Sequence, residues 1–179
     1  MVTTMKILAL SGSLRAASLN SALLRALARI APADIHVQLF AGVGALPLFN
    51  PDLEASDPAP VAALRQALLA ADAVVIASPE YAHGVSGVMK NALDWMVSNE
   101  SFINKPLALF NASPRATLAH AALRETLLTM SARVVDAASI TLPIIGAGIG
   151  EDGIAEHPEM RAALLAALRR LQADATSQL

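Results

Sequence analysis

The chain has 179 residues, with 13 basic and 15 acidic side chains, a formal net charge of −2 and no cysteine. The lack of cysteine excludes disulfides, thiolate metal sites and thiol redox chemistry. Because there is no basic stripe or charge run, we do not expect nucleic acid as a partner. The apolar run at residues 7–10 is too short for a secretory leader, and no run of about 18 apolar residues exists to span a membrane. We therefore expect a cytoplasmic protein without a membrane contact.

The composition is apolar for a chain whose length suits one domain. Hydrophobic residues make up 55% of the chain and aromatic residues only 3%. An excess of apolar side chains favours contacts between subunits. An alanine-rich composition that fills helix surfaces explains the same numbers equally well, so both interpretations stay open at this point.

Five short apolar runs alternate with five helical patterns along the chain. We expect strands at residues 6–10, 35–40, 73–77, 107–110 and about 134–142, and helices near 19–30, 61–70, 88–97, 117–131 and from Pro158 onward. The third run is apolar throughout, which is typical of a strand buried on both faces of a parallel sheet. Glycines between residues 146 and 153 predict a flexible segment. The alternation indicates an α/β fold, a doubly wound five-stranded parallel sheet between two helix layers, in a single domain over residues 1–179.

The loop after the first strand reads SGSLRAASLN and is polar in a largely apolar chain. Ligands of open α/β sheets bind beyond the carboxyl ends of the strands, so this loop is a candidate site. It precedes a helix N-terminus, whose free N–H groups favour an anion, and Arg15 adds a permanent charge that can fork onto phosphate oxygens. The loop therefore predicts a cradle for a single phosphate. The alternative is an ordinary turn in which Ser18 caps the helix and Arg15 lies in solvent.

Other templates for this kind of sheet do not match. A dinucleotide fingerprint needs G-x-G-x-x-G and a Walker loop needs G-K-[ST], whereas only Gly12 is present, so a mononucleotide fits better. The four histidines are scattered without metal-ligand spacing, and no G-x-S-x-G elbow occurs. A receiver domain would need an acidic residue where Ser78 ends the third strand.

The loop after the third strand reads SPEYAHGVSG. Gly84 allows the backbone to approach a flat ring such as a flavin closely. Tyr81 either packs along that ring or caps the core, and Glu80 is either a ligand or a structural anchor. His83 is expected to be hydrogen-bonded or exposed rather than catalytic.

Polar residues farther along the chain carry weaker signals. In the loop NASPRAT, Ser113 is a candidate contact to a cofactor edge. Arg115 either attracts a nicotinamide-dinucleotide phosphate or is a surface arginine at a helix start, and the second interpretation is slightly favoured. Lys90 and Asp94 lie four residues apart and are expected to pair on a helix face. Trp95 is expected in the core or at a subunit interface.

Two segments together resemble the NADPH-dependent FMN reductase family: SGSLRAASLN at residues 11–20 and PEYAHGVSGVMKNALDW at residues 79–95. That family includes quinone, chromate and azo-dye reductases with a flavodoxin-like fold. The likeness runs from the first strand to about the fourth helix, and both motifs lie in the expected order on the expected loops. The resemblance implies strand order 2-1-3-4-5, bound FMN, NADPH or NADH as electron donor, and a homodimer or homotetramer with residues 90–95 near a subunit contact.

The same resemblance implies a set of cofactor contacts. The phosphate of FMN would be held by the first motif and its ring would lie on residues 79–84. The cofactor-binding residues expected are Ser11, Ser13, Leu14, Arg15, Ser18, Asn20, Pro79, Glu80, Tyr81, Ala82, Gly84 and Ser113. The chain departs from the family pattern at three places: Ala82 replaces a usual Asn, Ser86 a common Pro, and residues 113–116 a Gly-Gly pair. These departures leave FMN binding expected, and leave the choice of nicotinamide and acceptor open.

The reaction implied is hydride transfer from NAD(P)H to FMN, then delivery of electrons to a small acceptor such as a quinone, free flavin, azo compound or metal oxyanion. Neither a catalytic side chain nor a metal ligand is predicted. One alternative is a flavodoxin-type electron carrier, although such carriers tend to be acidic and to sandwich the ring between aromatics, whereas here only Tyr81 is near. Another is a sensor or assembly subunit that uses the fold without flavin.

Overall fold

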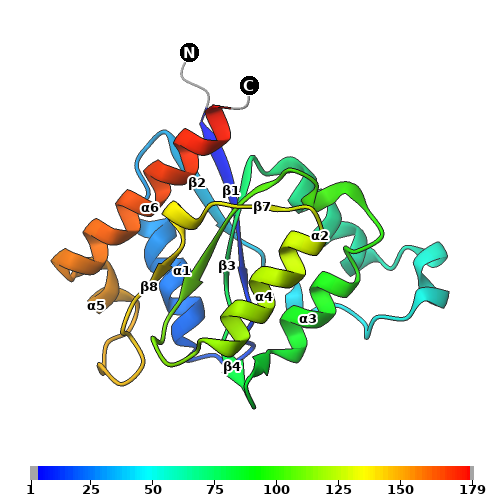
Figure 1. Ribbon diagram of the computed structural model, residues 1–179, viewed down its shortest axis with the longest axis horizontal. Helices are drawn as coiled ribbons and strands as arrows, with labels where there is room; N and C mark the ends of the chain where they lie inside the picture. The colour runs from blue at the N-terminus through cyan, green and yellow to red at the C-terminus, as the bar shows by residue number, and fades with distance from the viewer. Residues whose placement is uncertain (1–3, 178–179) are drawn as a thin grey trace.

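The computed structural model describes residues 4–177 and arranges them in three layers, with a parallel sheet between two layers of helices (Figure 1). The sheet is built from β1 (Met5–Ser11), β2 (Ile35–Leu39), β3 (Ala73–Ala77), β6 (Pro106–Asn111), β7 (Arg133–Val134) and β8 (Ile140–Thr141). Its order is β2-β1-β3-β6-β7, with β8 also paired to β6. Ile7 lies opposite Ala73, and Val74 opposite Leu107, in parallel register. The predicted order 2-1-3-4-5 is confirmed.

Helices cover both faces of this sheet. One face carries α1 (Leu19–Ile30), α5 (Glu151–Glu156) and α6 (Pro158–Thr176), and the other carries α2 (Ala59–Ala70), α3 (Gly87–Asp94) and α4 (Leu118–Thr129) (Figure 1). Short 3₁₀ turns occur at Val43–Ala45, Pro51–Ser56, Glu100–Phe102 and Asp136–Ala138. A small hairpin of β4 (Glu80–Tyr81) and β5 (Gly84–Val85) stands apart from the main sheet. The bounds of α1 and β3 are those that the apolar pattern predicts.

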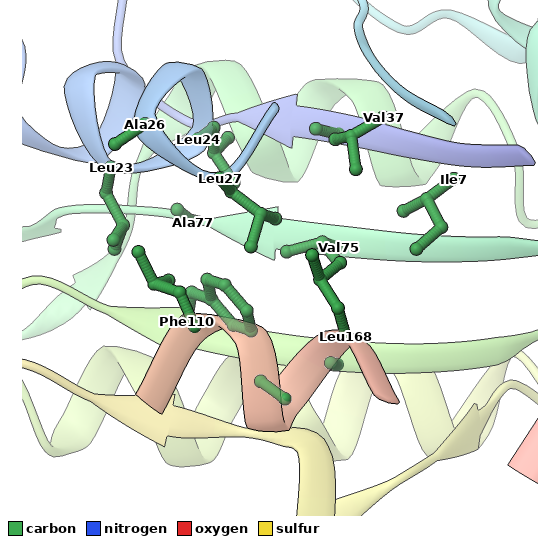
Figure 2. Close-up of a cluster of buried hydrophobic side chains, with 14 of the residues drawn as sticks. Ile7, Leu23, Leu24, Ala26, Leu27, Val37, Val75, Ala77, Phe110 and Leu168 are labelled. Carbon is green, nitrogen blue, oxygen red and sulfur yellow. The ribbon is translucent and has the colours of Figure 1, made fainter. Parts of the chain in front are cut away.

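The alternation of side chains along the strands creates two cores, one on each face of the sheet. In β1, Ile7 belongs to the core under α1 and α6, whereas the next residue, Leu8, belongs to the core under α2 and α3. Figure 2 shows the first core, where Leu27 of α1 and Leu168 of α6 point toward the side chains of the strands. Every residue of β3 is buried, which confirms that this strand is covered on both faces.

The fifth strand is not the continuous run over residues 134–142 that its apolar pattern predicts. It is split into β7 and β8 by the 3₁₀ turn at Asp136–Ala138. Opposite this turn, the N–H of Leu109 donates to Oγ of Ser139 (3.0 Å) instead of to a backbone carbonyl. Asp136 is drawn outward into an ion pair with Arg124 of α4. The hydroxyl of Ser139 thus takes the place of a backbone acceptor in the ladder.

The glycine-containing segment at residues 146–153 is only partly the flexible stretch that its composition predicts. Gly153 lies inside the helix α5, although glycine is a poor helix former. This helix packs on α1: Ile154 and Ala155 are buried, and Glu151 pairs with Arg25 (2.6 Å). Tertiary contacts therefore override local propensity here.

Among residues 4–177, no helix is both long and apolar enough to cross a bilayer. Over the same residues, no three His, Cys, Asp or Glu side chains come together in a group that could hold a metal ion.

Candidate functional site

A cavity of about 390 Å³ opens beyond the carboxyl ends of β1, β3 and β6. Eight of the twelve predicted cofactor-binding residues line it: Ser13, Arg15, Ser18, Asn20, Pro79, Glu80, Tyr81 and Ser113. They come from three loops that are far apart in sequence and meet because their strands are neighbours in the sheet. This is the edge at which ligands bind in sheets of this kind.

The N-terminus of α1 forms one wall of the cavity. Ser18 is its N-cap, and its Oγ accepts from the N–H of Ser21 (3.2 Å), as the alternative interpretation of this loop requires. The first turn of the helix contains no acidic residue. Arg15 is exposed and also lines the cavity. The cap thus leaves the positive end of the helix beside a guanidinium, with no carboxylate in that turn to neutralise it.

Asn20 carries an unusual buried amide in the first turn of α1. The residue is only 5% exposed, and its Oδ1 has no hydrogen-bond partner in the described part of the chain. Buried polar atoms are nearly always paired in folded proteins, and an unpaired one needs an explanation. Since Asn20 lines the cavity, a polar ligand there would supply the missing partner for this amide.

Serine hydroxyls fix the shape of the first loop. Ser11 Oγ lies 2.8 Å from Ser21 Oγ and accepts from the N–H of Ser13 (3.3 Å). Ser13 Oγ in turn accepts from the N–H of Arg15 (3.4 Å). Ser11 does not line the cavity, so its hydroxyl supports the loop without facing the cavity.

Gly12 is the close contact between the first and second loops. A Cβ built on it would lie 2.3 Å from Ser78 Oγ and 2.9 Å from Ser86 Oγ. Ser86 Oγ donates to the carbonyl of Gly12 (2.6 Å) and accepts from the N–H of Met89 as the N-cap of α3 (3.3 Å). The hydroxyl that stands where the family commonly has proline therefore connects the loops after β1 and β3. The sequence signal for this contact was the glycine itself.

Glu80 attaches the second loop to α4. Its Oε2 accepts from the N–H of Ala119 (2.9 Å), and its Oε1 lies 3.2 Å from Nδ1 of His83. The Ala119 hydrogen bond, followed by the contact with His83, lowers the pKa of the Glu80 carboxyl below its ordinary value. The residue is thus an anchor that also lines the cavity. Because its carboxylate fills the N-terminus of α4, whose N-cap Thr117 makes no side-chain cap, α1 offers the freer anion site.

The hairpin between β4 and β5 displays Tyr81 at the mouth of the cavity. Tyr81 is 59% exposed, so the idea that it caps the core is wrong. Ala82 and His83, the two turn residues, both have positive φ. The His83 side chain is 80% exposed, lies within hydrogen-bonding distance of Glu80 and does not line the cavity.

The side chain of Asn111 holds the third loop in shape by hydrogen bonds to its backbone. Its Oδ1 accepts from the N–H of Ser113 (3.0 Å) and its Nδ2 donates to the carbonyl of Ala116 (2.9 Å). Ser113 Oγ accepts from the N–H of Arg115 (3.3 Å). This tight loop brings the buried Ser113 and the exposed Arg115 to the cavity together.

Four predicted contacts lie outside the cavity lining: Ser11, Leu14, Ala82 and Gly84. Leu14 is 61% exposed and points toward Gly44, where it would contact any added Cβ at 2.7 Å. Ala82 is at the tip of the hairpin, and Gly84 is on its far strand. Four residues line the cavity that were not in the predicted set, namely Leu19, Arg115, Ala116 and Ile145. Leu19 lies between the predicted Ser18 and Asn20, and Arg115 and Ala116 follow the predicted Ser113 in the same loop, but nothing in the glycine-rich segment singled out Ile145.

The ten arginines of the chain all lie within residues 4–177, and eight of them are engaged. Six pair with carboxylates: Arg25, Arg29, Arg65, Arg124, Arg133 and Arg169. Two donate to backbone carbonyls: Arg161 and Arg170. Within the described part of the chain, the guanidinium groups of Arg15 and Arg115 have neither kind of partner, and both line the cavity.

Two side predictions from the α3 motif can be checked. Lys90 Nζ donates to Asp94 Oδ1 (2.6 Å), which confirms the expected helix pair. Trp95 is 2% exposed and its Nε1 donates to the carbonyl of Pro47 (2.8 Å), so it belongs to the core. Phe49 packs edge-on against its ring, with centroids 5.2 Å apart.

Several known proteins resemble this chain in sequence and in structure. The family model described as NADPH-dependent FMN reductase matches residues 5–146. An NAD(P)H-dependent FMN reductase of Pseudomonas aeruginosa is 40% identical over 111 residues, 60% of each chain, and a quinone reductase of Escherichia coli K12 is 35% identical over 113 residues, 61% of this chain and 60% of the relative. The chain thus spans about 60% of the length of these relatives.

The structural comparison extends over nearly the whole molecule. FerB of Paracoccus denitrificans, described as a flavoenzyme NAD(P)H:(acceptor) oxidoreductase, superposes with a TM-score of 0.83 at 27% identity and covers 97% of this chain and 98% of its own. The fold is therefore flavodoxin-like, as predicted. With the family model matching most of its length, the chain belongs to the NADPH-dependent FMN reductase family.

Proposed function

We propose that residues 1–179 form a single FMN-binding domain that takes electrons from NADPH or NADH and passes them to a small acceptor. The acceptor classes are a quinone, a free flavin, an azo compound or a metal oxyanion. Membership of the family supports the activity, and the names of the relatives as FMN reductase and quinone reductase support flavin and quinone as acceptors. We further propose that the protein works in the cytoplasm as a homodimer or homotetramer.

The observation that carries this proposal is the unsatisfied polar chemistry at the start of α1. The unpaired Arg15, the buried Oδ1 of Asn20 and the open positive end of the helix all border one cavity. A phosphate monoester supplies the negative charge that Arg15 and the helix terminus lack. A flip of the Asn20 amide by about 180° exchanges the unpaired Oδ1 for Nδ2, which can donate to a phosphate oxygen. The residues present therefore fit the phosphate end of FMN.

The rest of the cavity fits the ring end. Pro79 and Tyr81 offer flat apolar surface, and the buried Ser113 offers a hydroxyl for a polar edge. The exposure of Tyr81 leaves this end open for a nicotinamide or an acceptor to enter. When bound, FMN supplies the redox chemistry, accepting hydride from the nicotinamide and giving electrons to the acceptor. The protein binds and orients, and we assign no side chain as general acid or base.

The test begins with the visible spectrum of the purified protein before and after NADPH is added under nitrogen. We expect a flavin spectrum that NADPH bleaches, and steady NADPH oxidation when a quinone is the sole added acceptor. A carrier that needs a partner protein would not turn over with quinone alone. A protein that takes up no FMN would overturn the proposal.

Arg15→Ala tests the phosphate site directly. Loss of a charged hydrogen bond should weaken FMN affinity by about 1.5–3 kcal/mol, roughly 10- to 150-fold. Arg170→Ala is the matched control, because Arg170 bonds a carbonyl of residue 137 and does not line the cavity. Unchanged FMN affinity in Arg15→Ala would remove that residue from the site.

A further inference from the structure

The second guanidinium without an ion-pair or carbonyl partner among residues 4–177, that of Arg115, stands on a different loop from Arg15 and from the start of α1. It stands in the loop after β6, whereas Arg15 stands in the loop after β1, with β3 between the two strands. Two strand spacings separate these loops at their base by about 10 Å. One cavity thus holds two guanidinium groups that have no ion-pair or carbonyl partner among residues 4–177, on loops that leave the sheet at different strands.

The carboxylate of Glu80 does not neutralise Arg115. Among residues 4–177, no ion pair to Arg115 forms, and the oxygens of Glu80 are engaged by the N–H of Ala119 and by His83. The charge of Glu80 is thus held at the start of α4. The third loop, by contrast, holds Arg115 at the cavity through the backbone bonds made by Ser113 and Asn111.

The chemistry of the ring identifies an anion that Arg115 can meet. Oxidised FMN has a neutral ring, whereas at neutral pH the two-electron-reduced ring carries a negative charge, and a nearby protein charge tunes that balance. With its phosphate at α1, FMN would have its ring against the part of the lining that the other two loops contribute, which includes Pro79, Tyr81 and Arg115. We propose, on the basis of the proposed function, that Arg115 binds the reduced form of FMN more tightly than the oxidised form and so raises its reduction potential.

Thermodynamic linkage makes this proposal measurable. The potential of bound FMN differs from that of free FMN by the ratio of the two affinities, so a residue that favours one state must shift the potential. A charge that meets only the phosphate favours both states equally, because the phosphate does not change on reduction. Arg15 and Arg115 are therefore expected to have different signatures.

The experiment compares Arg115→Gln with Arg15→Gln in the FMN-loaded protein at pH 8. For each variant, the affinity for oxidised FMN is measured by titrating the flavin-free protein. The midpoint potential of bound FMN is measured against a reference dye, with the protein in excess over FMN. In Arg115→Gln we expect the affinity for oxidised FMN to change by less than about twofold. The affinity for reduced FMN should fall by about three- to tenfold, which lowers the two-electron potential by about 15–30 mV. Arg15→Gln should weaken both states alike and leave the potential unchanged.

Two further variants sharpen the result. Arg115→Lys keeps the positive charge, so its midpoint potential should stay close to that of the wild-type protein. Arg170→Gln removes an arginine outside the cavity and should change neither the FMN affinity nor the potential. If Arg115→Gln weakens both oxidation states equally, Arg115 shares the phosphate with Arg15 and the proposal is wrong. It is equally wrong if neither affinity nor potential changes. Failure of the wild-type protein to bind FMN would instead reject the proposed function itself, so the two failures are distinguishable.

Discussion

At the scale of single residues, the backbone conformation of Ala82 lowers the stability of the fold, and a substitution can relieve this strain. Its φ is +49°, in the left-handed region, and His83 follows at +62°. Two positive φ values in a two-residue hairpin are the pattern of a turn that favours Asn and Gly, and an L-residue with a Cβ pays about 1–2 kcal/mol there. We expect Ala82→Gly to raise the free energy of unfolding by about 0.5–1 kcal/mol, measured by urea denaturation.

The control for Ala82→Gly is an alanine of ordinary conformation. Ala166 is exposed inside α6, and Ala166→Gly should lower the free energy of unfolding by about 1 kcal/mol. Opposite signs for the same chemical change would assign the effect to the hairpin backbone. Destabilisation by both variants would show that residue 82 gains nothing from the freedom of glycine.

The polar cavity residues show how far the sequence predicts a site at this scale. Ser13, Arg15, Ser18 and Asn20 were predictable because they form one contiguous motif before a helix, and a helix N-terminus has a known chemistry. Ile145 was not predictable, because it reaches the cavity from a loop more than a hundred residues away in sequence. That Arg15 and Arg115 lack partners is also beyond the sequence, since pairing depends on which carboxylates the fold brings near.

At the scale of elements, the link between the hairpin and α4 predicts a dependence of stability on pH. The N–H of Ala119, and then His83, hold the pKa of Glu80 below its ordinary 4.5. A carboxyl whose pKa is lower when folded adds stability above the unfolded pKa and loses it as pH falls through the folded one. The protein with Glu80 should have a higher free energy of unfolding than Glu80→Gln. This difference should be constant from pH 7 to about 5 and shrink below pH 4.5.

This comparison is cleanest in a His83→Ala background, where charge on the imidazole cannot contribute. Urea denaturation of the FMN-free pair at several pH values gives the difference directly. If the difference in the free energy of unfolding between the two proteins were the same at pH 3 and at pH 7, the carboxylate of Glu80 would have no role as an anchor for α4.

The helix α5 makes a second prediction at this scale, because it contributes to the core despite its glycine. Ile154 within it is fully buried, whereas Ile145, nine residues earlier, is 45% exposed at the cavity. Ile154→Ala should lower the free energy of unfolding by about 2–4 kcal/mol, and Ile145→Ala by less than about 1 kcal/mol. Equal small effects in urea denaturation would mean that α5 is only loosely attached to α1.

The elements that the sequence misses share a cause. The break between β7 and β8 depends on the hydroxyl of Ser139 accepting from Leu109, and α5 depends on Arg25 and buried contacts with α1. Both depend on contacts between residues far apart in the sequence, which the local spacing of apolar residues cannot predict. The elements predicted at their observed bounds, α1 and β3, have a strong amphipathic pattern and an unbroken apolar run.

At the scale of the whole molecule, alternation of strand and helix was enough to predict a doubly wound sheet, because parallel strands need crossover helices. The same topology brings the loops after β1, β3 and β6 to one edge. A ligand that bridges these loops therefore binds only when the whole sheet is folded. Its binding free energy must then appear as global stability.

This coupling predicts a thermal shift on adding FMN to the flavin-free protein. At 100 times its dissociation constant, a ligand bound only to the folded state adds about 2.7 kcal/mol. For a chain of this size that raises Tm by about 5–10 °C. Riboflavin, which lacks the phosphate, should give a much smaller shift, and in Arg15→Ala the FMN shift should fall by about half or more. Equal shifts with riboflavin and FMN would place the main contacts at the ring instead of at α1, and no shift with either would leave the fold as a scaffold without flavin.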